Sequence, residues 1–160
     1  MSILDELLSM PEDFEVAFQK LPMELRHWAP KSWHGIPGEK FSALEQACHL
    51  RDIEIDGYHD RFTRTLQEEC PSLASLDGYA LARERQYSTL DSIEVIDCFR
   101  RSRTQTVKFL KGLSDADLNR RAIYGAYGEV SLNGLIHLLR SHDLQHLACM
   151  HWLFARIYSK

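Results

Sequence analysis

The chain has 160 residues, a length that predicts one domain with a core large enough to fold without covalent staples. Its apolar fraction of 44% and charged fraction of 26% are ordinary for a globular protein, and its net charge of −4 offers no broad attraction for nucleic acid or anionic lipid. No apolar run approaches the roughly 20 residues that span a bilayer, and the acidic N-terminus is unlike a secretory signal. Four cysteines without a C-x-x-C spacing favour reduced thiols in a cytoplasmic protein.

The first helix is expected to start near Pro11, because proline followed by Glu12 and Asp13 is typical of a first helical turn. Its apolar residues continue to about Pro22. A loop is expected over residues 29–40, where proline and glycine recur and no regular structure is predicted.

The second helix is predicted from Ser42, which forms a capping box with Glu45, to about Glu69, where Pro71 stops it. Beside its apolar stripe lies a row of titratable side chains that are three, four and three residues apart along the helix. These side chains are His49, Asp52, Asp56 and His59.

Residues 70–91 are too many for a tight turn between neighbouring antiparallel helices. They predict a long crossover, so that the second and third helices run in the same direction. The third helix is expected from Asp91 to Gly112, and its basic residues are interpreted as a solvated face. No convincing strand is found, so an all-α four-helix bundle is the most economical architecture.

The fourth helix is predicted over residues 131–156, with Ser131 as its N-cap. At about 100° per residue, His142 and His146 fall on its apolar side. A four-residue step allows both imidazoles to reach one metal ion, which makes half of a metal site. The alternative is a pair of histidines packed in a metal-free core.

A third ligand must come from another inward-facing stripe, and His49 is the best candidate because His59 lies too far along the helix axis. Asp52, one turn from His49, would be an oxygen ligand or an acceptor for the second nitrogen of that imidazole. A competing interpretation takes residues 142–146 as a variant of the H-E-x-x-H zinc-protease helix, with Asp143 as the base. Too few residues follow to supply the downstream ligand that those enzymes use.

Two segments resemble the DinB-like superfamily of metal-binding four-helix bundles. EKFSALEQACHLRDIE is similar to its W-S-x-x-E-x-x-x-H-L-x-D-x-E motif, with Phe41 at the usual tryptophan, and LNGLIHLLRSHDLQHLACM is similar to its C-terminal H-D-x-x-H helix. The resemblance covers about residues 10–155. It implies an up-down-down-up bundle and a divalent metal bound by His49, His142 and His146.

Cys149 stands where many members of that superfamily have glutamine. It shares a helix face with the last two histidines, so it is a candidate fourth ligand, an oxidisable neighbour or part of the core packing. Trp33 and Tyr127 are expected to line the substrate pocket, because they lie in the loops thought to surround the site.

Three imidazoles leave a position on the metal open to water or a thiolate. Together with the thiol-dependent S-transferases of the superfamily, this predicts a metal-dependent thiol S-transferase or hydrolase acting on a small molecule. Asp52 is expected to support the ligands, and Asp56 or His59 to transfer protons. The expected cofactor is a divalent ion, zinc or nickel, with a low-molecular-weight thiol as a candidate co-substrate.

Two further hypotheses stay open. The second hypothesis is a non-catalytic bundle in which the metal stabilises a sensor or interaction module, and a closed four-ligand site would favour it. A metal-free helical domain with histidines in its core is the third hypothesis, and chelation without effect on the melting temperature would support it. No nucleic-acid or membrane partner is expected, whereas a homodimer is.

Overall fold

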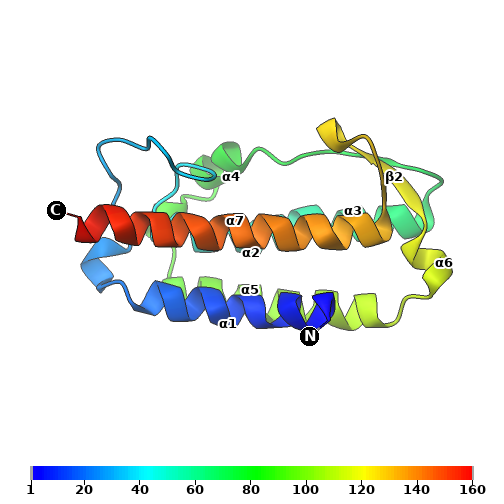
Figure 1. Cartoon of the computed structure of the whole chain (residues 1–160), viewed down its shortest axis with the longest axis horizontal. Coiled ribbons are helices and arrows are strands. Elements are labelled where there is room, and N and C mark those ends of the chain that lie inside the picture. Colours follow the sequence, from blue (N-terminus) through cyan, green and yellow to red (C-terminus); the bar gives the residue numbers. More distant parts are fainter. Residues whose placement is uncertain (1, 160) are drawn as a thin grey trace.

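Four long helical segments lie side by side in the computed structural model, which describes residues 2–159 (Figure 1). They are α1 (Ile3–Gln19), the continuous segment of α2 (Ala43–Asp52), η2 (Ile53–Tyr58) and α3 (His59–Gln67), α5 (Ser92–Lys111) and α7 (Leu132–Tyr158). Both α1 and α2 pack against α5 and against α7, which closes the bundle. In Figure 1, α1 and α7 run one way and α2, α3 and α5 the other, so the up-down-down-up topology is confirmed. Among the described residues, no helix combines the length and apolar character needed to cross a bilayer.

The connection between α3 and α5 is the predicted crossover, and it runs back along the bundle (Figure 1). It contains β1 (Ser72–Leu73), α4 (Gly78–Glu84) and the 3-10 turn η3 (Tyr87–Thr89). Short helical turns also occur at η1 (Met23–Leu25) and α6 (Asp115–Leu118). The crossover matters for function because it lays α4 across the second helical segment.

A small three-stranded sheet was not predicted from the sequence. β1 pairs in parallel with β2 (Arg121–Tyr124), and β2 pairs antiparallel with β3 (Glu129–Ser131) through the turn η4 (Gly125–Tyr127). The expectation of no strands was wrong because strands of two to four residues are too short to show a period-two pattern, and β1 and β2 are far apart in the chain.

The start of α1 also differs from the prediction. The helix begins at Ile3 with Ser2 as its N-cap, and Pro11 lies inside it. Proline lacks the N–H that would bond the carbonyl four residues earlier, which is that of Leu7. That carbonyl instead accepts a hydrogen bond of 2.9 Å from Nη1 of Arg103, so the helix passes through the proline without a buried unpaired acceptor.

Arg103 belongs to a buried ion cluster that joins three of the four segments. Its guanidinium donates to both oxygens of Glu54 at 3.0 and 2.8 Å and to both oxygens of Asp143 at 2.7 and 3.0 Å. All three side chains are buried. Asp143 is therefore committed to a structural ion pair, which removes it as the base of a zinc-protease motif.

The segment η2 is a π-helical turn between α2 and α3. Its i→i+5 hydrogen bonds make it equivalent to one inserted residue in an α-helix. In a regular α-helix, at about 100° per residue, His59 would lie about 80° from His49 around the helix axis. With the inserted residue the angle between them becomes about 180°. The same insertion reduces the angle between Arg61 and His49 around the axis from about 120° to about 20°. The π-turn thus decides which side chains share a face with His49.

Candidate metal centre

Three imidazoles converge inside the bundle, one from the end of α2 and two from the middle of α7. Nε2 of His142 lies 3.2 Å from Nε2 of His49 and 3.1 Å from Nε2 of His146. One ligand atom from each of the three lies within 4.8 Å of the other two. In a tetrahedral site with metal–nitrogen bonds of about 2.0–2.1 Å, two ligand nitrogens are about 3.3 Å apart. The spacing of these nitrogens therefore fits a single cation.

Burial keeps the three imidazoles uncharged. It lowers the pKa of His49 to about 4, and burial together with the neighbouring His49 lowers that of His142 to about 3. The pKa of His146 falls well below its usual value for the same reasons, burial first and then its two histidine neighbours. A neutral imidazole offers the lone pair that a metal requires, so no proton has to be displaced at neutral pH.

Gln46, which lies one turn before His49 on α2, fixes the tautomer of His146. Its Nε2 donates to the carbonyls of Glu39 and Phe41 at 3.3 and 3.2 Å, so its Oε1 is the atom that faces His146. Nδ1 of His146 is in close contact with that oxygen and must therefore carry the proton. This leaves the lone pair of His146 on Nε2, the atom directed at the other histidines.

The ring of His49 is positioned by packing instead of by a hydrogen bond. Its Nδ1 is buried and has no hydrogen-bond partner. Gly78, the first residue of α4, lies so close that a Cβ there would be 2.6 Å from Cε1 and 2.8 Å from Nδ1 of the ring. Phe41 also packs against this imidazole, with its ring centroid 5.3 Å from that of His49. The absence of a side chain at Gly78 makes room for the imidazole.

Glu39 brings a carboxylate to the same cluster. Its Oε1 lies 3.9 Å from Nε2 of His49, and its Oε2 lies 3.6 Å from Nε2 of His146. Because the imidazoles are neutral, these contacts are not ion pairs. Oε2 is buried and has no hydrogen-bond partner, so this oxygen is available to a cation or to a water molecule.

A small cavity of about 130 Å³ opens onto the cluster. His49, His142 and Glu39 line it together with Arg61. The rest of the wall consists of aliphatic and hydroxyl-bearing side chains from η2, the crossover and the sheet: Ile53, Tyr58, Ser75, Leu76 and Tyr124.

Asp52 and Asp56 have other partners than the histidines. The oxygens of Asp52 accept from Nε of Arg51 at 2.6 Å and from the hydroxyl of Tyr87 at 2.6 Å. Arg85 contacts both carboxylates, at 2.9 Å for Asp52 and 2.7 Å for Asp56. The structure therefore does not bring Asp52 to the second ring nitrogen of His49, which stays unpaired.

His59 points away from the cluster, as the phase of the π-turn requires. Its Nε2 lies 2.8 Å from the hydroxyl of Thr106 and 3.3 Å from that of Ser102, both on α5. The hydroxyl of Thr106 donates to Glu54 at 2.5 Å, so His59 is connected to the buried ion cluster and not to the three imidazoles.

Cys149 is buried beside Gly38, and its thiol is not among the groups that converge with the imidazoles. Burial, reinforced by the charge of Glu39, raises the pKa of Cys149 to about 11, so it stays protonated. Trp33 stacks on Trp152 with ring centroids 5.9 Å apart, and Tyr127 stacks on Tyr124 at 5.4 Å. Of the two stacks, only Tyr124 lines the small cavity, so neither Trp33 nor Tyr127 does.

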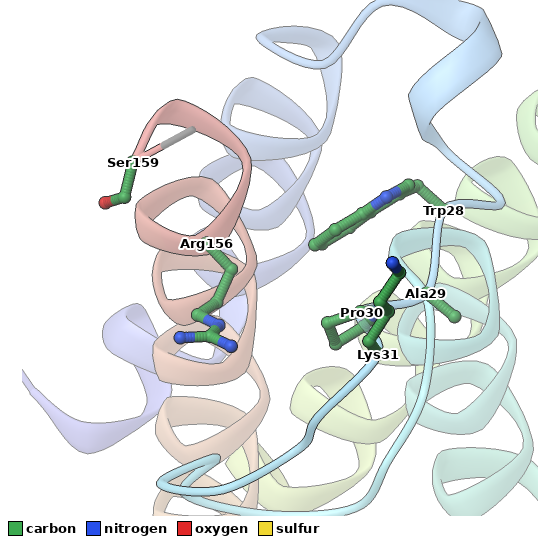
Figure 2. A pocket seen from close by; sticks show the side chains of 6 residues that line it. All are labelled: Trp28, Ala29, Pro30, Lys31, Arg156 and Ser159. Atoms are coloured by element: carbon green, nitrogen blue, oxygen red, sulfur yellow. The ribbon is translucent and has the colours of Figure 1, made fainter.

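A larger pocket of about 640 Å³ lies elsewhere, between the loop after η1 and the last turns of α7. Figure 2 shows Trp28 and Arg156 facing this hollow from the two sides. Arg156 is ten residues beyond His146, which is about 15 Å along the helix axis. None of its lining residues is a histidine, cysteine or carboxylate, so this pocket offers none of the usual metal ligands.

Sequence reasoning missed Glu39, Gln46, Arg61 and Gly78. Gln46 could have been found, since it lies three residues before His49 on the same helix face. Glu39 lies in an irregular loop and Gly78 in the crossover, where no periodicity assigns a direction to a residue. Arg61 comes to this face only through the π-turn.

Comparisons with known proteins give the family and the fold. A profile of the DinB superfamily matches residues 6–150. Among solved structures, YfiT from Bacillus subtilis aligns with a TM-score of 0.83 and 19% identity, over 97% of this chain and 85% of that chain. It is described as a probable metal-dependent hydrolase with an unusual four-helix bundle topology. At this identity the likeness establishes the fold. The search of curated proteins gave no match.

Proposed function

This chain belongs to the DinB superfamily, as its two histidine segments predicted, and we propose that it is a metal-dependent hydrolase. The observation that carries the proposal is the convergence of three uncharged imidazoles, whose Nε2 atoms are 3.1–3.2 Å apart from His49 through His142 to His146. His49, His142 and His146 would hold one divalent cation. The description of YfiT as a probable metal-dependent hydrolase supports the same reaction class.

A divalent cation on three imidazoles supplies Lewis acidity, which lowers the pKa of water to around 7 and polarises a carbonyl. The chain supplies the remaining groups. Gln46 holds His146 in the tautomer that presents Nε2, and Phe41 and Gly78 pack against the ring of His49. Oε2 of Glu39, which has no other partner, accepts the proton of the attacking water and later returns it to the leaving group.

The donor set argues for chemistry over a purely structural metal. A structural zinc site has four protein ligands, whereas a catalytic site has three and keeps one position open. Cys149, the candidate fourth ligand, lies outside the group of ligand atoms that converge. The adjoining cavity gives a small molecule access to His49 and His142.

Thiol S-transfer is the second candidate. Three neutral imidazoles leave most of the charge of a divalent ion uncompensated, and such an ion stabilises a bound thiolate as well as hydroxide. The distinction is the nucleophile: a transferase turns over only when a low-molecular-weight thiol is added, whereas a hydrolase needs water alone.

The test combines metal titration with hydrolysis of a panel of activated esters and amides. Chelator-stripped protein should bind one zinc, nickel or cobalt ion per chain, and His142→Ala should bind at least 100-fold more weakly. His137→Ala is the matched control, because this histidine is exposed on the same helix. Glu39→Gln should keep metal affinity within a few-fold but lose 10²–10⁴-fold in hydrolysis. Equal metal binding by the parent and His142→Ala would refute the site.

A further inference from the structure

Arg61, on α3, is a buried cation without a counter-charge. Its side chain is only 3% exposed. Nη2 donates to the carbonyl of Ala74 at 3.2 Å, but Nε and Nη1 are buried and have no hydrogen-bond partner. Among the described residues, no carboxylate forms an ion pair with this guanidinium. The arginine of the ion cluster, Arg103, is in contrast bonded to two carboxylates.

The fold holds this guanidinium in place although it lacks an anion. The ring of Tyr58 lies 4.8 Å and that of Tyr124 4.6 Å from its central carbon. Gly57, within the π-turn, leaves space for it, since a Cβ there would be 3.0 Å from Nη1. Aromatic faces offset part of the charge but accept no conventional hydrogen bond. A buried, rigidly held, underbonded arginine is therefore prepared to receive an external acceptor.

The position of Arg61 indicates what that acceptor is for. Arg61 lines the same cavity of about 130 Å³ as His49 and His142. A molecule bound there would touch the guanidinium at one end while its other end reached the cation proposed above. A loaded metal would add a second positive charge to the cavity, which further favours an anionic occupant.

We propose that the substrate carries a carboxylate group, which binds Arg61 while the bond to be hydrolysed lies at the three histidines. The planar fork of a guanidinium matches a carboxylate. The apolar wall made by Ile53 and the two tyrosine rings suits a short carbon chain. Glu39, whose carboxylate lines the same cavity, disfavours a doubly charged phosphate. This inference rests on the proposed function only for the metal end of the substrate.

The experiment measures binding of acetate, with inorganic phosphate as the comparison, in a Tris chloride buffer at low ionic strength. The proteins are the parent, Arg61→Gln, which removes the charge, and Arg61→Lys, which keeps it without the fork. Arg64→Gln is the matched control, because Arg64 lies on the same helix, is partly exposed and pairs with Glu68. Calorimetry is run on zinc-loaded protein, and thermal unfolding with increasing acetate on metal-free protein.

Acetate should bind the parent and Arg64→Gln alike, bind Arg61→Gln at least tenfold more weakly, and bind Arg61→Lys with intermediate affinity. In the metal-free protein, acetate should raise the melting temperature of the parent but not of Arg61→Gln. Zinc should bind Arg61→Gln as tightly as the parent or more tightly, because a neighbouring positive charge is removed.

Equal acetate binding by the parent and Arg61→Gln would overturn the proposal, and so would phosphate binding tighter than acetate binding. Failure of the parent to bind zinc would instead refute the proposed function. The metal-free unfolding measurement would then still decide the role of Arg61. If Arg61→Gln did not fold, the comparison of Arg61→Lys with the parent would decide it in the same way.

Discussion

Replacing Gly78 by alanine should weaken metal binding without touching a ligand. The new Cβ would lie 2.6 Å from Cε1 and 2.8 Å from Nδ1 of His49. Non-bonded carbon atoms are normally about 3.5–4.0 Å apart, so the imidazole must retreat by about 1 Å. Metal–ligand distances tolerate deviations of only about 0.2 Å. The displacement is therefore several times larger than the site can absorb.

The expected loss is about 10–100-fold in metal affinity, the range seen when the support of a metal ligand is removed. At about 1.4 kcal/mol per factor of ten, this corresponds to roughly 1.4–2.8 kcal/mol. The free energy of unfolding of the metal-free protein should change little. Alanine restricts the unfolded chain, which raises this free energy by about 0.4–1 kcal/mol and offsets the cost of displacing the imidazole.

The assay is a competition between the protein and a chromogenic chelator for zinc, with urea unfolding of the metal-free protein alongside. Gly134→Ala is the control, since a Cβ at this glycine of α7 would meet its nearest neighbour, Oγ of Ser131, at an ordinary 3.4 Å. If Gly78→Ala bound zinc as tightly as the parent, α4 would have moved to accommodate the new methyl group while His49 kept its position. That result would refute the idea that close packing of Gly78 positions the imidazole.

Three further predictions concern the support of the site and its titration. Gln46→Leu removes the acceptor that orients His146 and should lower zinc affinity about 10–100-fold in the chelator competition. Arg103→Leu leaves two buried carboxylates without a counter-charge and should lower the free energy of unfolding in urea by about 3–5 kcal/mol. Arg100→Leu, at a half-exposed ion pair, should lower it by under about 1 kcal/mol. Equal losses for the two arginines would contradict the buried-cluster argument. In the folded protein the pKa of His142 is about 3 and that of His146 lies well below the unfolded value of about 6.5. The unfolded chain therefore takes up protons first on acidification, so metal-free stability is fully present above pH 6.5 and falls from about pH 6.5 to 3. Each imidazole contributes a slope of about 1.4 kcal/mol per pH unit, and His142→Ala should flatten the measured pH dependence by that amount; an unchanged slope would contradict the low pKa values.

Local sequence signals located much of the framework. Ser42 and Ser131 cap α2 and α7 as predicted, and Asp91 caps α5. These predictions succeeded because a cap is satisfied by hydrogen bonds within its own first turn. The predicted helix start at Pro11 was wrong for a reason that no local rule contains. The carbonyl that this proline leaves free accepts a hydrogen bond from Arg103, 92 residues further along the chain.

The predicted ligands and the predicted supporting residues had different outcomes. His49, His142 and His146 were identified because helix periodicity fixes the face on which each lies and a four-residue step sets the distance between the last two. Asp56 and His59 were chosen by extending the same periodicity beyond Asp52, where the π-turn interrupts it. Asp52 itself precedes the π-turn and is occupied by other hydrogen-bond partners. The angular error of one inserted residue, about 100°, is enough to exchange His59 for Arg61 on the face of His49.

The amino-acid sequence by itself determined the four amphipathic segments, the length of the crossover and the presence of two imidazoles one turn apart on an apolar face. Each of these follows from hydrogen bonds and side-chain spacing within a few residues. Only the tertiary structure decided that Glu39, Gln46, Gly78 and Arg61 surround the three histidines. Their positions depend on how a loop, a crossover and a π-turn pack against α7, and contacts between such distant segments are set by the closure of the whole bundle.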